Sequence, residues 1–505
     1  MGNTETKHVE YEEDAVDDVQ AAAPKGDESD PRVAPVRFGF PKGANKIPLF
    51  FLGLAAYRAW IEIVFVGSFV DFPIKSFAGH DAFDLVMAFF LIFFAFTSKR
   101  ISPFYNKRTV YGFAFGSLIL STLCAFTSLF LPEISYLLAW PAVFSGGLGV
   151  ALIILLWSEL YSCLNPIRVA LYYSASIVGA ALIIYLACGL LVPWLFVFTL
   201  ILPMLSLFCV SKGFNSLPSN ELPSNAVPTF SFPWKLVLLM AIYAFAYGLK
   251  EVGVYSTSLF GPHAAFGTCA VGLFIFLGVT VRGGKFDFGL IYRVALPLMV
   301  GAFLVLPSLG FLNQTMSGLF LTASYTAFSI LIMIIFSNIC YRYGVSAVWL
   351  FGIERGVRAI AGLLGRRTAE LSDLYGLSTG EASLAIAAIT ILLVVALTMI
   401  LLSEKELSSK WGISFLGGGS NAEDTAIIRK QELANRCSEV VKEYGLSQRE
   451  EEVLLLLAQG KTVGAIEREL FIANGTAKTH IRHIYRKLDI HARSELFDLL
   501  GVSNR

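Results

Sequence analysis

The chain has 505 residues, of which 55% are hydrophobic, 15% are charged and 42 are phenylalanine. Soluble domains carry roughly 25% charged residues, so this composition excludes a wholly soluble globular protein and indicates a membrane protein. The net charge of +1 hides an asymmetry, because an acidic N-terminal segment and a basic C-terminal segment cancel each other.

Residues 1–45 contain acidic runs at 12–14 and 17–18 and few bulky apolar side chains. Such a segment cannot bury enough apolar surface to offset the entropy lost on ordering, so we expect a disordered acidic tail. Two interpretations of this tail stay open. It is either a solvated segment with no specific role or an acidic mask for a basic surface elsewhere in the chain.

Apolar segments long enough to cross about 30 Å of hydrocarbon, roughly 20 residues each, recur between residues 46 and 403. This region is predicted to be an all-α, polytopic membrane bundle of about twelve helices. The eleventh helix is the least apolar, because it contains Glu354, Arg355 and Arg358. The predicted spans lie near 47–70, 81–98, 109–131, 134–157, 167–187, 190–211, 234–256, 262–281, 290–312, 316–340, 345–365 and 382–402.

A polar segment at 212–233, rich in Pro and Ser, divides the spans into six plus six and is predicted to be a central cytoplasmic loop. Lysine and arginine set the orientation of short loops, and they concentrate on the side that carries the N-terminus. An even number of spans then places the C-terminus on that cytoplasmic side as well. The opposite loops are poor in basic residues, except for Arg366 and Arg367 after the eleventh span.

Ionisable residues occur inside several predicted spans. An unpaired charge at mid-bilayer costs about 2.5–3.5 kcal/mol, so these side chains must face the interior of the bundle. They mark either a ligand or gating site near the midplane or internal ion pairs that fix helix register, with the i,i+4 spacing favouring pairs on one helix face. The candidates are Arg58 and Glu62 on the first span, Lys250 and Glu251 on the seventh, and Glu354, Arg355 and Arg358 on the eleventh.

Residues 404–425 include the run Gly417–Gly419 and are predicted to be a linker. The periodicity of 426–445 then favours a connecting helix that ends at Gly445. A capping box formed by Ser447 and Glu450 opens the next helix. Two more helices are expected near 463–470 and 476–488, and the second of these is rich in Lys, Arg and His. Two helices joined by a tight turn form the layout that places one helix in the major groove of DNA.

The segment 446–505 resembles the C-terminal helix-turn-helix domain of the LuxR/NarL/FixJ type, which has four helices. A basic amphipathic helix lying on anionic lipid is the competing interpretation, but such a helix needs no capped helical neighbours. The matching residues are Leu446-Ser447-x-Arg449-Glu450, Val453-Leu454, Gly460-Lys461, Thr476-x-Lys478-Thr479-His480 and Ile484-Tyr485-x-Lys487-Leu488. The segment departs from the family pattern at Ala465-Ile466-Glu467, Ala473 and Ala477.

The resemblance implies that the chain binds double-stranded DNA. It implies base contacts from Lys478, Thr479 and Arg482, and Lys and Arg suit the O6 and N7 atoms of guanine. Contacts with the phosphate backbone, which set register rather than sequence, are expected from Lys461, Thr476, Tyr485 and Lys487. In this family the fourth helix commonly pairs two domains, so a homodimer through Phe497 and Leu500 is expected.

The six-plus-six layout of residues 46–403 resembles the major facilitator superfamily. The loop SKRISPFYNKRTVYG keeps basic residues but lacks the aspartate of that family's loop motif. We therefore expect a one-component transcription regulator in a bacterial inner membrane that senses a small molecule or a membrane-derived signal. The alternative is a solute transporter with a regulatory DNA-binding tail.

Enzymatic activity, a metal site and a cofactor are not expected. The sequence presents no nucleophile–base set and no glycine loop suited to phosphate. Its seven cysteines form no Cys-x-x-Cys pair, so neither a zinc site nor a disulfide framework is indicated. These cysteines are expected to serve as small apolar packing residues.

Overall fold

The computed structural model separates into two compact units. The described residues of the membrane unit lie within 36–419, and those of the C-terminal unit lie within 420–505. The structure describes residues 48–67, 70–217, 222–223, 232–256, 264–282, 286, 288–305, 313–377, 380–401, 436–437, 439–441, 443–458, 463, 466, 470, 474–491, 495–496 and 499–500. The predicted tail at 1–45 and the predicted linker at 404–425 lie outside these residues.

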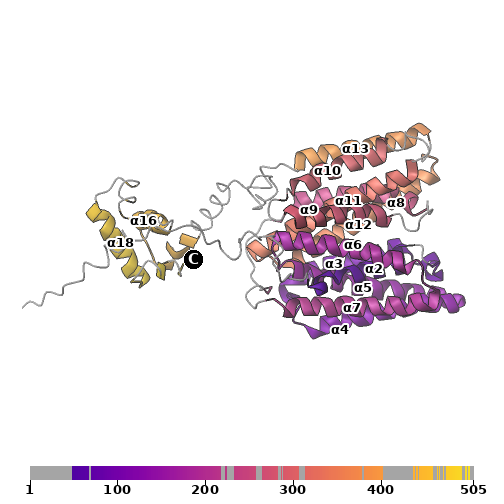
Figure 1. Ribbon diagram of the computed structural model, residues 1–505, viewed down its shortest axis with the longest axis horizontal. Coiled ribbons are helices and arrows are strands. Elements are labelled where there is room, and N and C mark those ends of the chain that lie inside the picture. Colours follow the sequence, from indigo (N-terminus) through magenta and orange to yellow (C-terminus); the bar gives the residue numbers. More distant parts are fainter. Residues whose placement is uncertain are drawn as a thin grey trace, which may run out of the picture. The chain divides into compact units, whose positions relative to one another are not determined.

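The described part of the membrane unit is built of helices that run side by side in a bundle (Figure 1). The first span is interrupted, since the α-helix α2 (Leu54–Ile61) lies between a 3-10 turn, η2 (Leu49–Leu52), and a π-helical turn, η3 (Glu62–Val66). The others are α3 (His80–Ile101), α4 (Arg108–Phe130), α5 (Ser135–Tyr161), α6 (Pro166–Ala187), α7 (Val192–Asn215), α8 (Trp234–Ser256), α9 (Ala264–Arg282), α10 (Gly289–Val300) with the π-helical η8 (Gly301–Val305), α11 (Asn313–Tyr343), α12 (Ala347–Leu374) and α13 (Gly380–Leu401).

Helices lie at each of the twelve predicted positions, and eight helical segments in the described part of the chain are long and apolar enough to cross a membrane. These eight segments coincide largely with the first span around α2 and with α3, α4, α5, α6, α7, α11 and α13. The chain is therefore a multi-pass membrane protein, while the number of twelve crossings stays a prediction. The helix α12 carries more charge, and the apolar parts of α9 and α10 are shorter.

The eleventh helix corrects the sequence-based boundary. The apolar pattern predicts that it ends at residue 365, with Arg366 and Arg367 in a loop, but α12 continues to Leu374. Both arginines are therefore helical. The reason lies in the tertiary structure. Carboxylates on two neighbouring helices compensate the charge of Arg366, so the helix can continue past the end of the apolar run.

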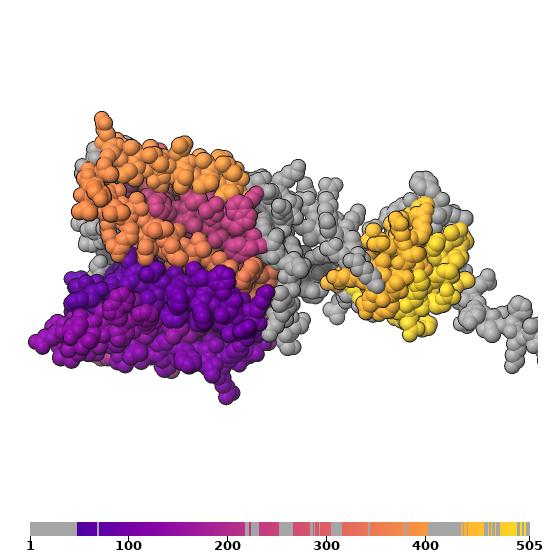
Figure 2. All heavy atoms as spheres, turned by 180° about the vertical axis from the view of Figure 1, so that it is seen from behind, coloured from indigo at the N-terminus to yellow at the C-terminus, as the bar shows by residue number. Residues whose placement is uncertain are grey.

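The helix α12 joins the two halves of the membrane unit. It packs against α3 of the first half and against α8 of the second half, and α6 packs against α9 in a second contact between the halves. The two halves lie beside one another on the face drawn in Figure 2, with indigo and purple on one side and orange on the other. The helix α12 is therefore packed between the two halves, with α3 on one side and α8 on the other.

Glycines allow these close approaches. A Cβ added at Gly248 of α8 would lie 2.2 Å from the carbonyl oxygen of Gly362 on α12. A Cβ at Gly365 would lie 2.2 Å from the carbonyl oxygen of Phe245 on α8. On the other side of α12, a Cβ at Gly352 would lie 2.7 Å from the carbonyl oxygen of Leu91 on α3. Small residues that bring backbones together are a common basis of helix packing in membranes.

The C-terminal unit has a hydrophobic core of its own. Helix α16 (Gln448–Ala458) contributes Val453, Leu454 and Leu457, and helix α18 (Asn474–Leu488) contributes residues of its inner face. The expected stop at Gly445 is confirmed by its φ of 63° and by the hydrogen bond from Leu446 N to Val441 O at 3.0 Å. This hydrogen bond, which spans six residues, is characteristic of a Schellman motif at the end of a helix. Only part of the predicted connecting helix lies within the described residues.

Candidate functional site

A cavity of about 270 Å³ lies within the membrane unit, between helices of both halves. Its wall includes five of the seven ionisable residues proposed from the sequence, namely Arg58, Glu62, Glu251, Arg355 and Arg358. Glu354 is not part of the wall but accepts a hydrogen bond from Arg358. Charged groups in a membrane interior face such cavities because the hydrocarbon cannot solvate them. The remaining wall is largely apolar and aromatic.

The pair Glu354 and Arg358 is formed as its spacing predicts. Arg358 Nε donates to Glu354 Oε1 at 2.7 Å, and its Nη2 reaches the same oxygen. Arg358 Nη1 also donates to Ser329 Oγ on α11 at 2.6 Å. Because Glu354 is 1% exposed and Arg358 is 7% exposed, this is a buried ion pair with three hydrogen bonds.

Lys250 takes a different place from the other candidates. Its Nζ lies 5.6 Å from the centre of the Phe303 ring, a cation–π distance, and the residue is not part of the cavity wall. The neighbouring Glu251 pairs with Arg366 on α12, its Oε2 lying 2.7 Å from Arg366 Nη1. Adjacent residues on a helix do not face each other, which explains why the two side chains separate.

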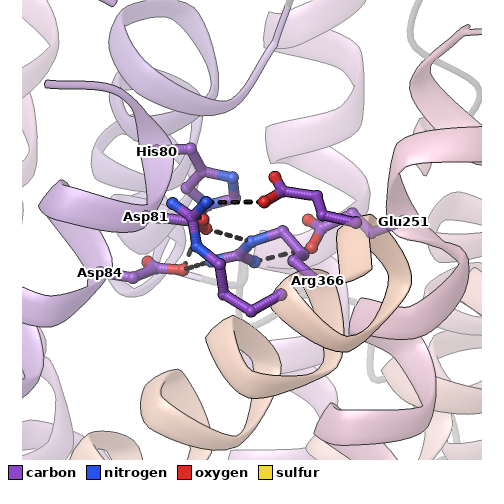
Figure 3. Close-up of polar contacts among 7 residues, drawn as sticks. His80, Asp81, Asp84, Glu251 and Arg366 are labelled. Atoms are coloured by element: carbon purple, nitrogen blue, oxygen red, sulfur yellow. Dashed lines mark hydrogen bonds and ion pairs between the residues drawn. The ribbon is translucent and has the colours of Figure 1, made fainter. Parts of the chain in front are cut away.

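Arg366 is the centre of a cluster that the sequence analysis did not propose (Figure 3). Its Nε lies 2.6 Å from Asp81 Oδ1 and its Nη2 lies 2.5 Å from Asp84 Oδ2, both on α3. His80 Nε2 lies 3.3 Å from the same oxygen of Asp84. With Glu251 from α8, one guanidinium contacts carboxylates from two helices of different halves. Four members of the cluster, namely His80, Asp84, Glu251 and Arg366, also line the cavity.

A signal for Arg366 existed in the sequence. Arg355 and Arg366 are eleven positions apart, about three helical turns, so they share a face if the helix continues. Asp81 and Asp84 are three apart and share a face in the same way. The apolar pattern placed these residues at the ends of spans, which hid their role.

The C-terminal unit exposes a basic helix face. On α18, Ala477 and Ile484 are 0% exposed and pack into the core of the unit. The side chains of Lys478, Thr479 and Arg482 are exposed on the opposite side. The structure thus places the three expected base-reading residues on one outward surface of one helix.

The start of α16 is held by the predicted capping box. Ser447 N donates to Glu450 Oε2 at 2.7 Å, and Glu450 N lies 3.4 Å from Ser447 Oγ. Lys487 Nζ, from the end of α18, donates to the same Glu450 oxygen at 2.7 Å and to Gly445 O at 3.2 Å. Burial alone would raise the pKa of Glu450, but the hydrogen bonds from Lys487 and Ser447 outweigh it and lower the pKa to about 2.

The other residues expected to contact DNA or a second copy differ in how exposed they are. Thr476 is exposed, while Tyr485 is half-buried and packs against the core of the unit. Lys461 and Phe497 lie outside the described residues. Leu500, expected on a dimer surface, is 2% exposed and belongs to the core, and its carbonyl oxygen accepts a hydrogen bond from Arg436 at 2.7 Å.

The family described as bacterial regulatory proteins, luxR family, matches residues 445–500. The spore germination protein GerE of Bacillus subtilis is 44% identical over 50 residues, which are 10% of this chain and 68% of GerE. The chain belongs to the luxR family through its C-terminal segment. The sequence-based resemblance to LuxR-type regulators is thereby confirmed.

Longer regulators match the luxR-type domain over the same stretch. A putative HTH-type transcriptional regulator of Aeromonas salmonicida is 48% identical over 54 residues, 11% of this chain and 28% of that protein. The transcriptional regulatory protein LiaR of B. subtilis is 50% identical over 50 residues, 10% of this chain and 24% of LiaR. The chain thus spans less than a third of the length of these two relatives.

Two solved transporter structures are similar to the larger part of the chain. The human organic anion transporter MFSD10 (TETRAN) has 16% identity and a TM-score of 0.43, over 70% of this chain and 98% of that chain. The major facilitator superfamily transporter FucP in the outward conformation has 14% identity and a TM-score of 0.41, over 70% of this chain and 97% of that chain. Neither likeness identifies what the membrane unit binds or moves.

Proposed function

We propose that this luxR-family protein is a membrane-embedded, one-component transcription regulator. The observation that carries the proposal is the outward face of Lys478, Thr479 and Arg482 on a luxR-type domain, within a chain whose other unit is a multi-pass membrane bundle. A cationic and polar face on a recognition helix suits the major groove. The proposal assigns the chain no catalytic step.

The membrane unit supplies the signal in this proposal. A ligand that binds the charged cavity shifts the bundle between two states only if its affinity differs between them. The cavity touches both halves and α12 contacts both, so occupancy of the cavity is well placed to change how the halves meet. The changed state then alters how many luxR-type domains are available for DNA.

The proposed setting is a bacterial inner membrane with both chain ends in the cytoplasm, where the luxR-type domain reaches the chromosome. The concentration of lysine and arginine in the loops of that side supports this orientation. Two copies would pair through the C-terminal segment, with Phe497 as the contact expected from the family and the 39% exposed Leu499 next to the buried Leu500.

The test is promoter occupancy in cells that express the full chain. DNA cross-linked to the protein is sequenced for the native chain, for Lys478→Ala and for Arg482→Ala. Each variant should lose about 1–3 kcal/mol of specific binding. Arg449→Ala is the matched control, because this exposed arginine pairs with Glu452 on α16. Unchanged footprints for both α18 variants would refute the assignment of α18 as the reading helix.

A transporter with a regulatory DNA-binding tail is the second candidate, and the charged cavity between the two halves is the observation that favours it. Solute uptake by residues 40–404 in proteoliposomes separates the two candidates. Robust uptake would contradict a pure receptor, whereas no uptake together with promoter occupancy would support one.

A further inference from the structure

The arginines of the cavity are compensated unequally. Arg358 has the full set of acceptors described above, from Glu354 and Ser329. Arg355, one turn away on the same helix, has no comparable acceptor. Its Nη2 lies 3.4 Å from Tyr173 Oη and 3.7 Å from Met333 Sδ, which are contacts with neutral atoms at long distances.

The nearest carboxylate, that of Glu354, does not form a hydrogen bond with Arg355. Arg355 Nε lies 3.4 Å from Glu354 Oε2, yet both atoms are buried and neither has a hydrogen-bond partner among the described residues. Buried polar atoms are almost always hydrogen-bonded, so an unpaired buried donor on a charged group needs an explanation. An acceptor that enters from the cavity supplies one.

A further arginine, Arg58, lines the cavity from the other half of the unit. It lies on α2, half-buried in the wall of the same cavity, and within the described part of the chain it has no hydrogen-bond or ion-pair partner. Arg58, Arg355 and Arg358 all belong to the wall of this one cavity, although Arg58 comes from the first half and the other two from the second.

The pairing of the charged residues at the cavity indicates which class of ligand it can bind. Most carboxylates at the cavity already have a partner, since Glu354 bonds to Arg358, while Asp81, Asp84 and Glu251 contact Arg366. Among the described residues, Arg58 and Arg355 are the cavity arginines that have no hydrogen-bonded carboxylate partner. A bound anion would supply the acceptor that these two arginines lack. The rest of the wall includes Ile61, Ile154 and Ile177, so the uncharged part of the ligand meets an apolar surface.

We propose that the cavity binds a small organic carboxylate, whose two oxygens accept hydrogen bonds from Arg355 and Arg58. Guanidinium groups bind planar carboxylates through paired, charge-assisted hydrogen bonds. The volume of about 270 Å³ lies at the lower end of the range for ligand pockets, so the molecule is small. Its source is either the aqueous phase or the bilayer, since short organic acids and fatty acids share this head group.

The test measures thermal unfolding of the purified full-length chain in vesicles of phosphatidylcholine, which has no net charge. The probes are butyrate, benzoate and octanoate, each compared with its own amide at concentrations on the order of 10 mM, and inorganic phosphate. A ligand that binds only the folded state raises the unfolding temperature. At least one carboxylate should raise it more than its amide does.

The variants assign the effect to the two arginines. Each of the variants Arg355→Gln and Arg58→Gln should reduce the carboxylate-specific rise in unfolding temperature to the value expected for a tenfold lower affinity. If Arg355→Gln fails to fold, Arg58→Gln still tests the proposal. Arg168→Gln is the matched control, because this exposed arginine lies outside the cavity. Equal shifts from every carboxylate and its amide would overturn the proposal. So would a carboxylate-specific shift that persists in the arginine variants that fold, or a larger shift from phosphate than from any carboxylate.

The probes also separate the two sources. Stabilisation by octanoate alone would assign the ligand to the bilayer, and stabilisation by butyrate or benzoate would assign it to the aqueous phase. The inference rests on the proposed function, in which the anion is the signal that the membrane unit senses. Because the assay contains no DNA, absence of a carboxylate effect contradicts the anion site alone, whereas lost promoter occupancy contradicts the regulator.

Discussion

Arg366 and Glu251 form an ion pair with 2.7 Å between Nη1 and Oε2, and the pair joins α12 to α8. The two residues are 115 positions apart in the chain. They meet because Gly248 and Gly365, within one turn of each, let the two backbones approach closely. The same guanidinium reaches Asp81 and Asp84 on α3, so one side chain connects three helices.

Arg366→Gln should destabilise the membrane unit strongly. Removing one partner of a buried ion pair costs about 3–5 kcal/mol, because the remaining charges stay buried without compensation. Thermal unfolding in detergent measures the effect. Arg367→Gln is the control, since its side chain is 54% exposed and its loss should cost about 1 kcal/mol or less. Equal stability of the two variants would contradict a structural role for the cluster.

Glu354→Gln should strengthen carboxylate binding while weakening the fold. The substitution removes the carboxylate that neutralises Arg358, so Arg358 joins Arg58 and Arg355 as a cavity arginine without a hydrogen-bonded carboxylate. Titration of the carboxylates against the purified variant should therefore give a higher affinity than for the native chain, together with a lower unfolding temperature. An affinity that falls with the loss of this carboxylate would show that Glu354 contacts the ligand directly.

Gly248→Ala and Gly365→Ala should separate α8 from α12. Each added Cβ would meet a backbone carbonyl oxygen at 2.2 Å, which no side-chain rotation relieves. Overpacking of this kind costs about 1–3 kcal/mol and should also weaken the contact between Arg366 and Glu251. Gly112→Ala on α4 is the matched control, because a Cβ there has open space within 4 Å. Thermal unfolding of all three variants in one detergent compares them directly.

The luxR-type domain should lose stability in acid because of Glu450. Its pKa in the folded state is lowered to about 2, below the ordinary value of about 4.3 for an unfolded chain. The contribution of the ionised carboxylate is therefore present above about pH 4.3 and is lost as the pH falls toward 2. Unfolding of residues 420–505, which have a core of their own, should follow this range when monitored by circular dichroism.

Lys487→Met tests the cause of that pH dependence. Without the ammonium group, the pKa of Glu450 should rise toward its ordinary value and the acid-dependent part of the stability should shrink. Glu452→Gln is the control, because its carboxylate pairs with the exposed Arg449 rather than with Lys487. An unchanged pH profile in Lys487→Met would contradict the role of this hydrogen bond.

The local features of this protein were determined by the sequence. Apolar runs predict where helices lie because each run must cover hydrocarbon along its whole length. The capping box of Ser447 and Glu450 and the stop at Gly445 depend on neighbours within a few residues, so they were predictable too. The same holds for the charged residues of the cavity, since a charge inside a span has to face inward.

Only the tertiary structure decided which charges meet. Asp81 and Arg366 are 285 residues apart, and each stood at the edge of an apolar run, where hydropathy alone assigns a side chain to water. Leu500 was likewise expected on a dimer surface, yet it packs into the core of its own domain. The local sequence pattern shows how polar a residue is, but it does not identify the partner of a buried charge. That partner is determined by how the helices pack, and close contacts such as that of Gly248 with Gly362 set this packing.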